Sequence, residues 1–322
     1  MNVKFKKFKK KTGRTLTKAV IDIGSNSIKL RVVSKKGNML RTVLDTTEVV
    51  RLGKRLEGGV IDEETIRHGV DVIRKLTQLA GEKGANRPRL VGTMALRIAG
   101  NAGEFVRMVR ECTGFSVEIL SGEEEARLAW LGATMALGVT GGDTTVFDTG
   151  GGSTEFIFGK GTQIMNRLSA PLGAVYLTEK FFTSDPIDPE SLRTAREYIR
   201  CILTSAGGFG RNEPSFVIGL GGGVVTMASV KLALPFFSPE TVNGTSLTKG
   251  DIDAQVALYA SSSNTERMKI VGLSPKRADI ILASACIVQC VLEVLRSDIF
   301  RVSINGLRHG LLLEMFKGKT LV

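Results

Sequence analysis

The chain has 322 residues, of which 43% are hydrophobic, and it carries a formal net charge of +12 at pH 7. This length and aliphatic content are enough to bury a sizeable core and predict two domains, which excludes a disordered chain or a small disulfide framework. Because the sequence contains no apolar run of about 18 residues and no secretory signal, we expect a cytoplasmic protein without a membrane span.

The excess positive charge is concentrated at the N-terminus. Residues 1–18 contain eight lysines and arginines and no acid, which leaves 36 basic residues against 32 acidic ones in the rest of the chain. We expect residues 1–17 to form a basic flexible tail. Such a tail either only solubilises the protein or contacts polyphosphate, RNA or an acidic membrane surface through its charge. No specific nucleic-acid recognition is expected.

Strand and helix patterns alternate through the first half of the chain. Strands are predicted at residues 18–22, 28–34 and 38–50, and a helix begins after the N-cap Asp62 and ends near residue 81. A strand at 90–92 opens onto TMALR, a helix follows at 102–113 and a strand at 116–120. The next helix begins with SGEEEAR, where Ser121 and Glu124 predict a capping box.

The pattern then restarts. Strands at 144–148 and 155–158 surround a glycine-rich turn, and a helix follows at 191–205. The strand 215–220 precedes three glycines and a helix at 225–232. A long helix at 278–295, a strand at 301–304 and a closing helix at 307–316 complete the predicted elements.

The most informative stretch is VFDTGGGSTEFIF, residues 146–158. Its glycines allow close backbone approach, so that successive N–H groups can converge on phosphoryl oxygens. Asp148 and Glu155 bracket this turn, and carboxylates beside a phosphate imply a metal ion or an activated water. Alternatively, the stretch is a tight hairpin whose glycines only serve chain geometry.

An internal repeat supports the phosphate interpretation. VIDIGSNSIKLRVV, residues 20–33, has the same order of apolar strand, aspartate, glycine-containing turn with hydroxyls and second strand as residues 146–159. Asp22 and Asp148 occupy the same place in the two hairpins. The repeat predicts a duplicated domain, and two such domains facing across a cleft would hold a phosphate chain from both sides.

With VIGLGGGVVTMA at residues 217–228, the hairpins resemble the paired phosphate loops and third glycine loop of the actin, Hsp70 and sugar-kinase superfamily. Within it, DIGSNS, VGTMALR, SGEEEAR, DTGGGSTE and NGLRHGLLLE together resemble the exopolyphosphatase and guanosine pentaphosphate phosphatase (Ppx/GppA) family. The resemblance implies an α/β fold of two duplicated ribonuclease-H-like (actin-like ATPase) domains with an active-site cleft between them.

The same resemblance divides the chain. Domain I comprises residues 18–138 and is completed by the C-terminal helix 306–322, and domain II comprises residues 139–305. Because longer family members continue into an additional helical domain of the HD type, we expect a short, two-domain member.

The resemblance also implies a reaction, the hydrolysis of a terminal phosphoanhydride of polyphosphate or pppGpp with Mg²⁺ or Mn²⁺. Glu125 matches the base that orients the attacking water, with Glu123 and Glu124 as adjacent alternatives. A negatively charged first helical turn explains all three without any function. Asp148 and Glu155 match further catalytic carboxylates, and together with Asp22 they are the expected metal ligands.

Phosphate oxygens are expected to bind to donors of both hairpins, of TMALR and of the third glycine loop. These residues are Ser25, Asn26, Ser27, Thr93, Arg97, Gly150, Gly151, Gly152, Ser153, Thr154, Gly221, Gly222 and Gly223. Arg97 either clamps a phosphoryl group or forms a surface salt bridge. The third glycine loop either binds phosphate or is only a tight turn required by packing. Arg267, Lys276, Arg277 and Arg308 either extend the phosphate channel or are solvated surface charges.

Two other functions stay open. A kinase of the same superfamily would transfer phosphate from ATP to an acceptor and would use an aspartate rather than Glu125 as its base. A non-catalytic sensor would bind nucleotide or polyphosphate without turnover, although the set of Glu125, Asp148 and Glu155 argues against it. The sequence does not choose between polyphosphate and pppGpp as the substrate. It also leaves open whether the protein forms a homodimer.

Overall fold

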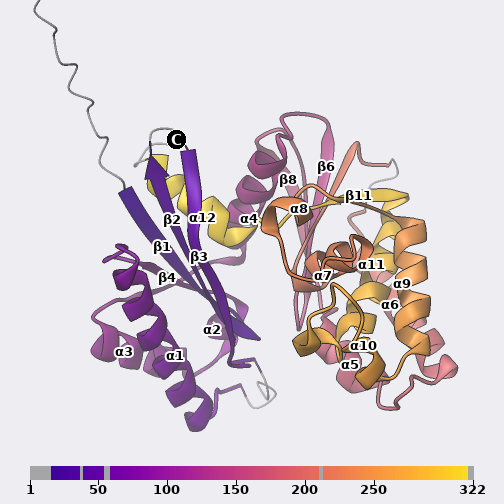
Figure 1. The fold of residues 1–322 in the computed structure, drawn as a ribbon, viewed down its shortest axis with the longest axis horizontal. Helices are drawn as coiled ribbons and strands as arrows, with labels where there is room; N and C mark the ends of the chain where they lie inside the picture. Colours follow the sequence, from indigo (N-terminus) through magenta and orange to yellow (C-terminus); the bar gives the residue numbers. More distant parts are fainter. Residues whose placement is uncertain (1–15, 37–38, 54–58, 210–212, 318–322) are drawn as a thin grey trace, which may run out of the picture.

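Two β-sheets with helices on their faces make up the protein, and they lie side by side in Figure 1. The computed structural model describes residues 16–36, 39–53, 59–209 and 213–317, so nearly all of the expected basic tail lies outside the described residues. The first sheet has five strands in the order β3-β2-β1-β4-β5, and the second has six in the order β10-β11-β9-β6-β7-β8. The predicted α/β fold is confirmed.

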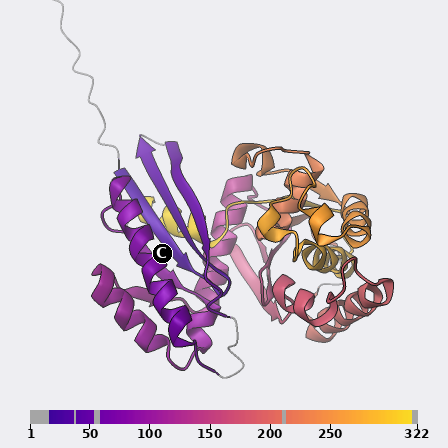
Figure 2. The ribbon, with the colours of Figure 1, turned by 60° about the horizontal axis from the view of Figure 1, so that its bottom comes forward.

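The first sheet begins with an antiparallel meander of β1 (Leu16–Ile23), β2 (Ser27–Lys36) and β3 (Met39–Val49). Strands β4 (Arg89–Gly92) and β5 (Val117–Ile119) extend it in parallel with β1. Helices α1 (Glu63–Glu82) and α3 (Ala102–Thr113) cover one face, as Figure 2 shows.

Side-chain alternation along β1 sets the direction of its aspartate. Ile21 and Ile23 pack under α1 and α3, whereas Val20 packs on the opposite face against α4 (Gly122–Leu137) and α12 (Leu307–Lys317). Since successive side chains of a strand point to opposite faces, Asp22 shares the face of Val20. That face is turned towards the second sheet.

The second sheet repeats the meander with β6 (Asp143–Thr149), β7 (Thr154–Lys160) and β8 (Gln163–Ala170). Strand β9 (Phe216–Leu220) runs parallel to β6, β11 (Ile299–Val302) runs parallel to β9, and β10 (Ser246–Thr248) is antiparallel to β11. One face packs on α11 (Ile281–Leu295), which is apolar and buried around most of its circumference, as expected of a central helix.

Helix α4 lies between the two sheets (Figure 1). Its Leu128 belongs to the apolar cluster with α12 and the first sheet, and its Trp130 belongs to the cluster with the second sheet. Glycines allow α12 to approach α4 closely, because a Cβ at Gly310 would lie 2.1 Å from the Leu128 carbonyl oxygen. The C-terminal helix therefore returns to the first sheet.

Several elements differ from the prediction. The sequence analysis did not predict α2 (Met94–Ile98), β8, α5 (Ala174–Phe181), β10 or α9 (Lys249–Ser261). The capping box of α4 is only half formed, because the Ser121 hydroxyl accepts from the Glu124 N–H while the Glu124 carboxylate pairs with Arg127. The remaining elements are α6 (Pro189–Ala206) and α7 (Gly222–Lys231), which were predicted, and α8 (Pro239–Val242), α10 (Asn264–Arg267) and a 3₁₀ turn at Pro275–Arg277, which were not.

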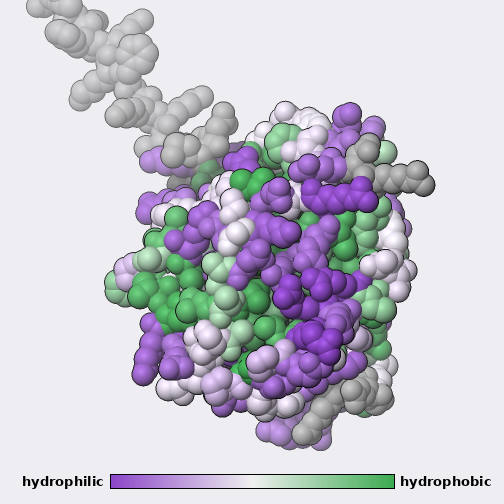
Figure 3. All heavy atoms as spheres, turned by 90° about the vertical axis from the view of Figure 1, so that its right-hand side faces the viewer, coloured by the Kyte–Doolittle hydropathy of each residue, from purple (hydrophilic) through white to green (hydrophobic). Residues whose placement is uncertain are grey.

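No helix in the described ranges has both the length and the apolar character needed to cross a bilayer. On the side of the molecule seen in Figure 3, hydrophilic and hydrophobic side chains are interspersed.

Candidate functional site

The two hairpins of the internal repeat close in the same way. The Gly24 N–H donates to the Ser27 carbonyl oxygen at 3.1 Å, and the Gly150 N–H donates to the Ser153 carbonyl oxygen at 2.9 Å. Each hydrogen bond joins residues three apart and closes the turn between the first two strands of its meander, β1 and β2 in one sheet and β6 and β7 in the other. The repeated sequence pattern is therefore also a repeated turn.

The residues opposite the two aspartates carry opposite charges. Asp22 pairs across the hairpin with Lys29, and Asp148 pairs with Glu155. Burial raises the pKa of Asp148, Lys29 lowers it and Asp22 raises it, so both groups of the first hairpin act on a carboxyl of the second. The sequence analysis missed Lys29, although its place in the repeat, equivalent to Glu155, was the signal that could have identified it.

The turns lie next to each other and next to TMALR. A Cβ at Gly151 would lie 3.6 Å from the Asn26 Cβ, and one at Gly152 would lie 3.6 Å from the Met94 Cε of α2. The Ser153 hydroxyl lies 3.8 Å from the Met94 sulfur. The structure thus brings three of the predicted phosphate-binding segments together.

Two predicted donors are engaged elsewhere. The Thr154 hydroxyl is buried and donates to the Leu172 carbonyl oxygen at 2.6 Å. Thr93 is buried at the start of α2, where its N–H donates to the Ile23 carbonyl oxygen at 3.2 Å. Since a hydroxyl has a single proton to donate, Thr154 holds the strand end rather than offering that proton to a phosphate.

Helix α5 anchors the second turn. The N–H groups of Ala174 and Val175 donate to the Gly150 and Gly151 carbonyl oxygens, both at 3.0 Å. This contact requires a glycine at 173, where a Cβ would lie 2.1 Å from the Gly151 carbonyl oxygen. The free N–H groups that begin a helix are thus satisfied by the loop, and the loop is held in place.

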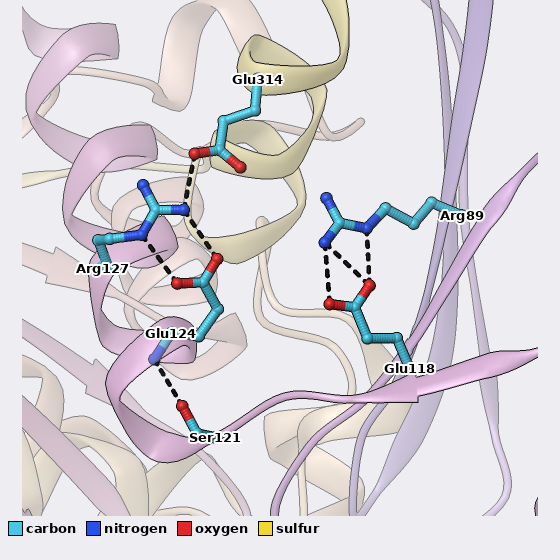
Figure 4. A network of polar contacts seen from close by, with 6 residues as sticks. All are labelled: Arg89, Glu118, Ser121, Glu124, Arg127 and Glu314. Carbon is cyan, nitrogen blue, oxygen red and sulfur yellow. Dashed lines mark hydrogen bonds and ion pairs between the residues drawn. The ribbon is translucent and has the colours of Figure 1, made fainter. Parts of the chain in front are cut away.

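The three consecutive glutamates of α4 have different partners. Glu123 forms an ion pair with Arg167 of β8. Glu124 pairs with Arg127 at 2.7 Å, and Arg127 also contacts Glu314 of α12 at 2.6 Å. Figure 4 shows Glu124 and Glu314 on either side of Arg127, while Glu118 pairs separately with Arg89. These contacts connect α4 to its neighbours.

Glu125 is the one of the three glutamates whose charge raises the pKa of a hairpin carboxyl, that of Glu155. Its Oε2 accepts from Arg97 at 2.6 Å, and Arg97 also donates to the Leu120 carbonyl oxygen at 3.0 Å. Burial raises the pKa of Glu125, the Arg97 contact lowers it, and the charges of Asp22 and Asp148 raise it. The predicted phosphate clamp Arg97 therefore lies beside the predicted base and pairs with it.

Four carboxyl groups, those of Asp22, Glu125, Asp148 and Glu155, interact through their charges where the two sheets face each other. The pKa of Glu155 is raised to about 7, because burial and the charges of Asp148 and Glu125 outweigh the lowering by the hydrogen bonds from the Ser153 and Ser169 hydroxyls. The Ser153 hydroxyl donates to Glu155 at 2.5 Å and the Ser169 hydroxyl at 3.2 Å. Buried carboxylates that repel one another favour a proton or a cation between them.

These acids fit a magnesium-type site in their chemistry. Within the described ranges, no three His, Cys, Asp or Glu side chains are grouped as a ready metal cage. Mg²⁺ does not need such a cage, because it is usually held by one or two carboxylates together with water and substrate phosphates. Asp22, Asp148 and Glu155 offer oxygen donors of the required kind, and their mutual repulsion would be relieved by a divalent cation.

The third glycine loop, at the start of α7, lies next to Asp148. Gly221 has φ +105°, and a Cβ there would lie 2.4 Å from the Thr149 carbonyl oxygen and 3.2 Å from Asp148 Oδ1. A Cβ at Gly222 would meet the Arg277 guanidinium at 2.1 Å, and one at Gly223 would meet the Ser284 Cβ at 2.5 Å. Tight packing thus accounts for all three glycines and brings Arg277 to the loop.

A cavity of about 1240 Å³ opens between the two sheets. Its lining contains Asp22, Asp148, Gly221 and Gly222 from the predicted site. Glu125 and Glu155 are not part of the lining and adjoin it through Asp22 and Asp148. Lys29 lies in the wall as well.

Of the four basic residues considered for a longer channel, Arg277 and Arg308 line this cavity. Arg267 does not, because its guanidinium is buried and donates to the Tyr259 carbonyl oxygen at 2.7 Å. The alternative of a solvated surface charge is therefore wrong for Arg267, whose side chain is part of the packing of the second domain.

The Ppx/GppA phosphatase family model matches residues 31–319. Exopolyphosphatase 2 of Mycobacterium tuberculosis is 28% identical over 315 residues, which cover 92% of this chain and 98% of that protein. Guanosine-5'-triphosphate,3'-diphosphate pyrophosphatase of Vibrio cholerae is 28% identical over 302 residues, which cover 92% of this chain and 59% of that protein. For the bifunctional 3-dehydroquinate synthase/phosphatase of Fusobacterium nucleatum the identity is 27% over 314 residues, 94% of this chain and 47% of that protein. The chain therefore spans about half the length of these last two relatives.

The crystal structure of the Aquifex aeolicus member of the Ppx/GppA family superimposes with a TM-score of 0.83 at 32% identity, over 96% of this chain and all of that one. An exopolyphosphatase from Cytophaga hutchinsonii has the same fold, with a TM-score of 0.85 at 24% identity over 95% of this chain and 99% of that one. The chain belongs to the Ppx/GppA phosphatase family and has its actin-like ATPase fold.

Proposed function

We propose that this protein is an exopolyphosphatase that releases the terminal phosphate of inorganic polyphosphate by metal-assisted attack of water, and that it also hydrolyses pppGpp to ppGpp. The observation that carries this proposal is that two matching phosphate-type hairpins bring Asp22 and Asp148 to one cavity, where their charges act on Glu125. The cavity beside them, with a volume of about 1240 Å³, has room for an extended substrate. The names of the mycobacterial and Vibrio relatives support the same substrate class.

Glu125 is the proposed general base. Arg97 holds its Oε2, and no other hydrogen bond among the described residues occupies its Oε1, which leaves that oxygen to accept a proton from water. The raised pKa of Glu125 suits proton transfer near neutral pH. As the water oxygen bonds to the terminal phosphorus, the bond to the bridging oxygen breaks, and the shortened chain leaves with that oxygen.

The hairpin turns would bind the phosphoryl oxygens. In the described part of the chain, the N–H groups of Gly151 and Gly152 donate to no backbone carbonyl, so they are available to an anion. Lys29, opposite Asp22, adds a positive charge at the same place. These donors would align the terminal phosphoryl group with the water held by Glu125.

Asp22, Asp148 and Glu155 would hold Mg²⁺ or Mn²⁺. Such an ion supplies positive charge to the phosphoryl oxygens as negative charge develops on them. The carboxylates themselves position the ion and remain in place during the reaction.

The test is phosphate release from long polyphosphate, tripolyphosphate, pppGpp and ATP in parallel, with Mg²⁺ and with EDTA. We expect release from long polyphosphate and pppGpp that EDTA abolishes. Consumption of ATP that depends on an added acceptor would instead indicate a kinase. Tight binding of polyphosphate without any release would indicate a sensor.

A further inference from the structure

The cavity is larger than the reacting group requires. Its volume of about 1240 Å³ exceeds the roughly 300–1,000 Å³ of ordinary small-molecule sites. Its walls are formed by β2 and β3 of the first sheet, by the start of α7 and by the start of α12. A substrate whose terminal phosphate lies at Asp22 and Asp148 therefore has room to continue along these walls.

Strand β2 contributes two positively charged side chains, Lys29 and Arg31, to the cavity wall. Lys29, Arg31 and Val33 are alternate residues of β2, so they share one face, and all three line the cavity. Two residues along a strand span about 7 Å, which places Arg31 one step beyond Lys29 along the strand. Positive charge therefore continues away from the catalytic carboxylates.

Arg31 meets a second arginine through one shared carboxylate. Its Nε lies 3.0 Å from Asp45 Oδ2, and the Arg308 Nη1 lies 2.5 Å from Asp45 Oδ1. Only 6% of the Arg31 side chain and 17% of the Arg308 side chain is exposed. Two guanidinium groups and one carboxylate leave one uncompensated positive charge in a largely buried place, which is electrostatically unfavourable without a further anion.

The neighbouring polar groups suit a phosphoryl group. Asn305 accepts from Arg31 at 2.9 Å and donates to Asn243 at 3.3 Å, and both asparagines line the cavity. Apart from the contact with Asp45, the Arg308 guanidinium has no hydrogen bond within the described residues. Its other N–H groups are therefore available, and a guanidinium fork matches the geometry of phosphate.

We propose that Arg31 and Arg308, bracketing Asp45, form a second anion subsite of the cleft, which binds a phosphoryl group remote from the one being hydrolysed. The proposal rests on the proposed function for the identity of the substrate. The group bound is either an inner phosphate of a polyphosphate chain or the 3'-diphosphate of pppGpp, because both present the same chemistry. Asp45 offsets one of the two arginine charges until the substrate binds.

Variants of opposite charge test the subsite. Arg308→Gln removes a charged donor, and we expect it to raise KM for long polyphosphate, for pppGpp or for both about tenfold, with kcat within about twofold. Asp45→Asn removes the competing negative charge, and we expect it to lower KM several-fold. Arg193→Gln and Asp143→Asn are the matched controls, since both residues are exposed, ion-paired and outside the cavity lining.

Two controls distinguish a loss of substrate binding from a loss of the folded structure. Arg308→Lys keeps the charge and should restore most of the affinity, while thermal unfolding of every variant shows whether the fold is retained. A KM in Arg308→Gln that is unchanged for both long polyphosphate and pppGpp, or a rise in KM in Asp45→Asn with the fold intact, would overturn the subsite. A KM rise confined to pppGpp or to long polyphosphate would identify which phosphoryl group occupies it.

Binding measurements keep this test independent of turnover. If the wild type releases no phosphate from any substrate, the proposed function fails, yet calorimetric titrations with polyphosphate and with pppGpp still compare the wild type with Arg308→Gln. Weaker binding by Arg308→Gln than by Arg193→Gln would then support the subsite. Equal binding would reject it.

Discussion

At the scale of single residues, three adjacent glutamates of similar chemistry perform different tasks because their side chains leave α4 in different directions. Glu123 pairs with Arg167 of the second sheet, and Glu124 pairs with Arg127 beside α12. Glu125 pairs with Arg97 and acts on the hairpin carboxyl groups. A negatively charged first turn, which the helix dipole favours, is thus combined with a separate role for each residue.

Glu125→Gln is expected to lower kcat for phosphate release at least about 100-fold, because glutamine cannot accept the proton of the attacking water. Binding of polyphosphate should be largely retained, since glutamine has nearly the same shape. Steady-state kinetics and calorimetry measure the two effects. Glu123→Gln and Glu124→Gln are matched neighbours whose kcat should stay within a few-fold of the wild type. Near-normal turnover by Glu125→Gln would remove Glu125 as the base.

His309 makes stability depend on pH. Burial, and to a lesser extent the charge of Arg31, lower its pKa to about 4. Because the unfolded chain binds this proton more readily than the folded one, the stabilisation is complete above pH 6.5 and is lost as pH falls towards 4.

His309→Gln should remove this dependence. Between pH 7.5 and pH 5, we expect the wild type to lose about 2 kcal/mol of unfolding free energy relative to the variant. Urea unfolding of both proteins at several pH values measures the difference. Parallel stability curves would show that His309 titrates normally in the folded protein.

At the scale of elements, the second phosphate-type turn depends on the start of α5. The short sequence of α5 carries no side-chain cap, and its first N–H groups are satisfied by loop carbonyls more than twenty residues earlier. Helix-start signals in a sequence are local, so this helix could not be identified from them. The turn itself was predicted because its glycines and flanking strands are local signals.

Gly173→Ala should displace that turn, because the new Cβ would lie 2.1 Å from the Gly151 carbonyl oxygen. We expect kcat/KM for polyphosphate to fall roughly 10- to 100-fold, the scale of a displacement of about 1 Å in an active site. Gly103→Ala in α3 is the control, since its Cβ would meet nothing within 4 Å and should leave activity unchanged. Activity of Gly173→Ala equal to that of the control would show that the turn tolerates the shift.

At the scale of the whole molecule, α12 connects the end of the chain to the first sheet. It packs on α4, which itself contacts both sheets, and Arg127 joins the two helices through Glu314. The helix that carries Glu125 is therefore held from both sides. Its position depends on contacts between residues far apart in the sequence.

Gly310→Ala should weaken this packing, because a Cβ there would lie 2.1 Å from the Leu128 carbonyl oxygen. Overpacking of this kind typically costs about 1–3 kcal/mol of unfolding free energy, which urea unfolding would measure. Gly250→Ala in α9 is the matched control, because its Cβ would meet only the Thr248 hydroxyl at 3.8 Å. Equal stability of both variants would show that α12 can move away from α4 at little cost.

The sequence by itself determined the α/β class, the two repeated hairpins and the set of acids to consider, because strand patterns and glycine turns are local properties of the chain. The family resemblance already pointed to Glu125, but only the tertiary structure gave each of the three glutamates its own partner and brought Lys29 to Asp148. It also joined Arg308 to Asp45 across 263 residues of sequence. These pairings depend on the direction in which side chains leave distant elements, and no local pattern encodes that direction.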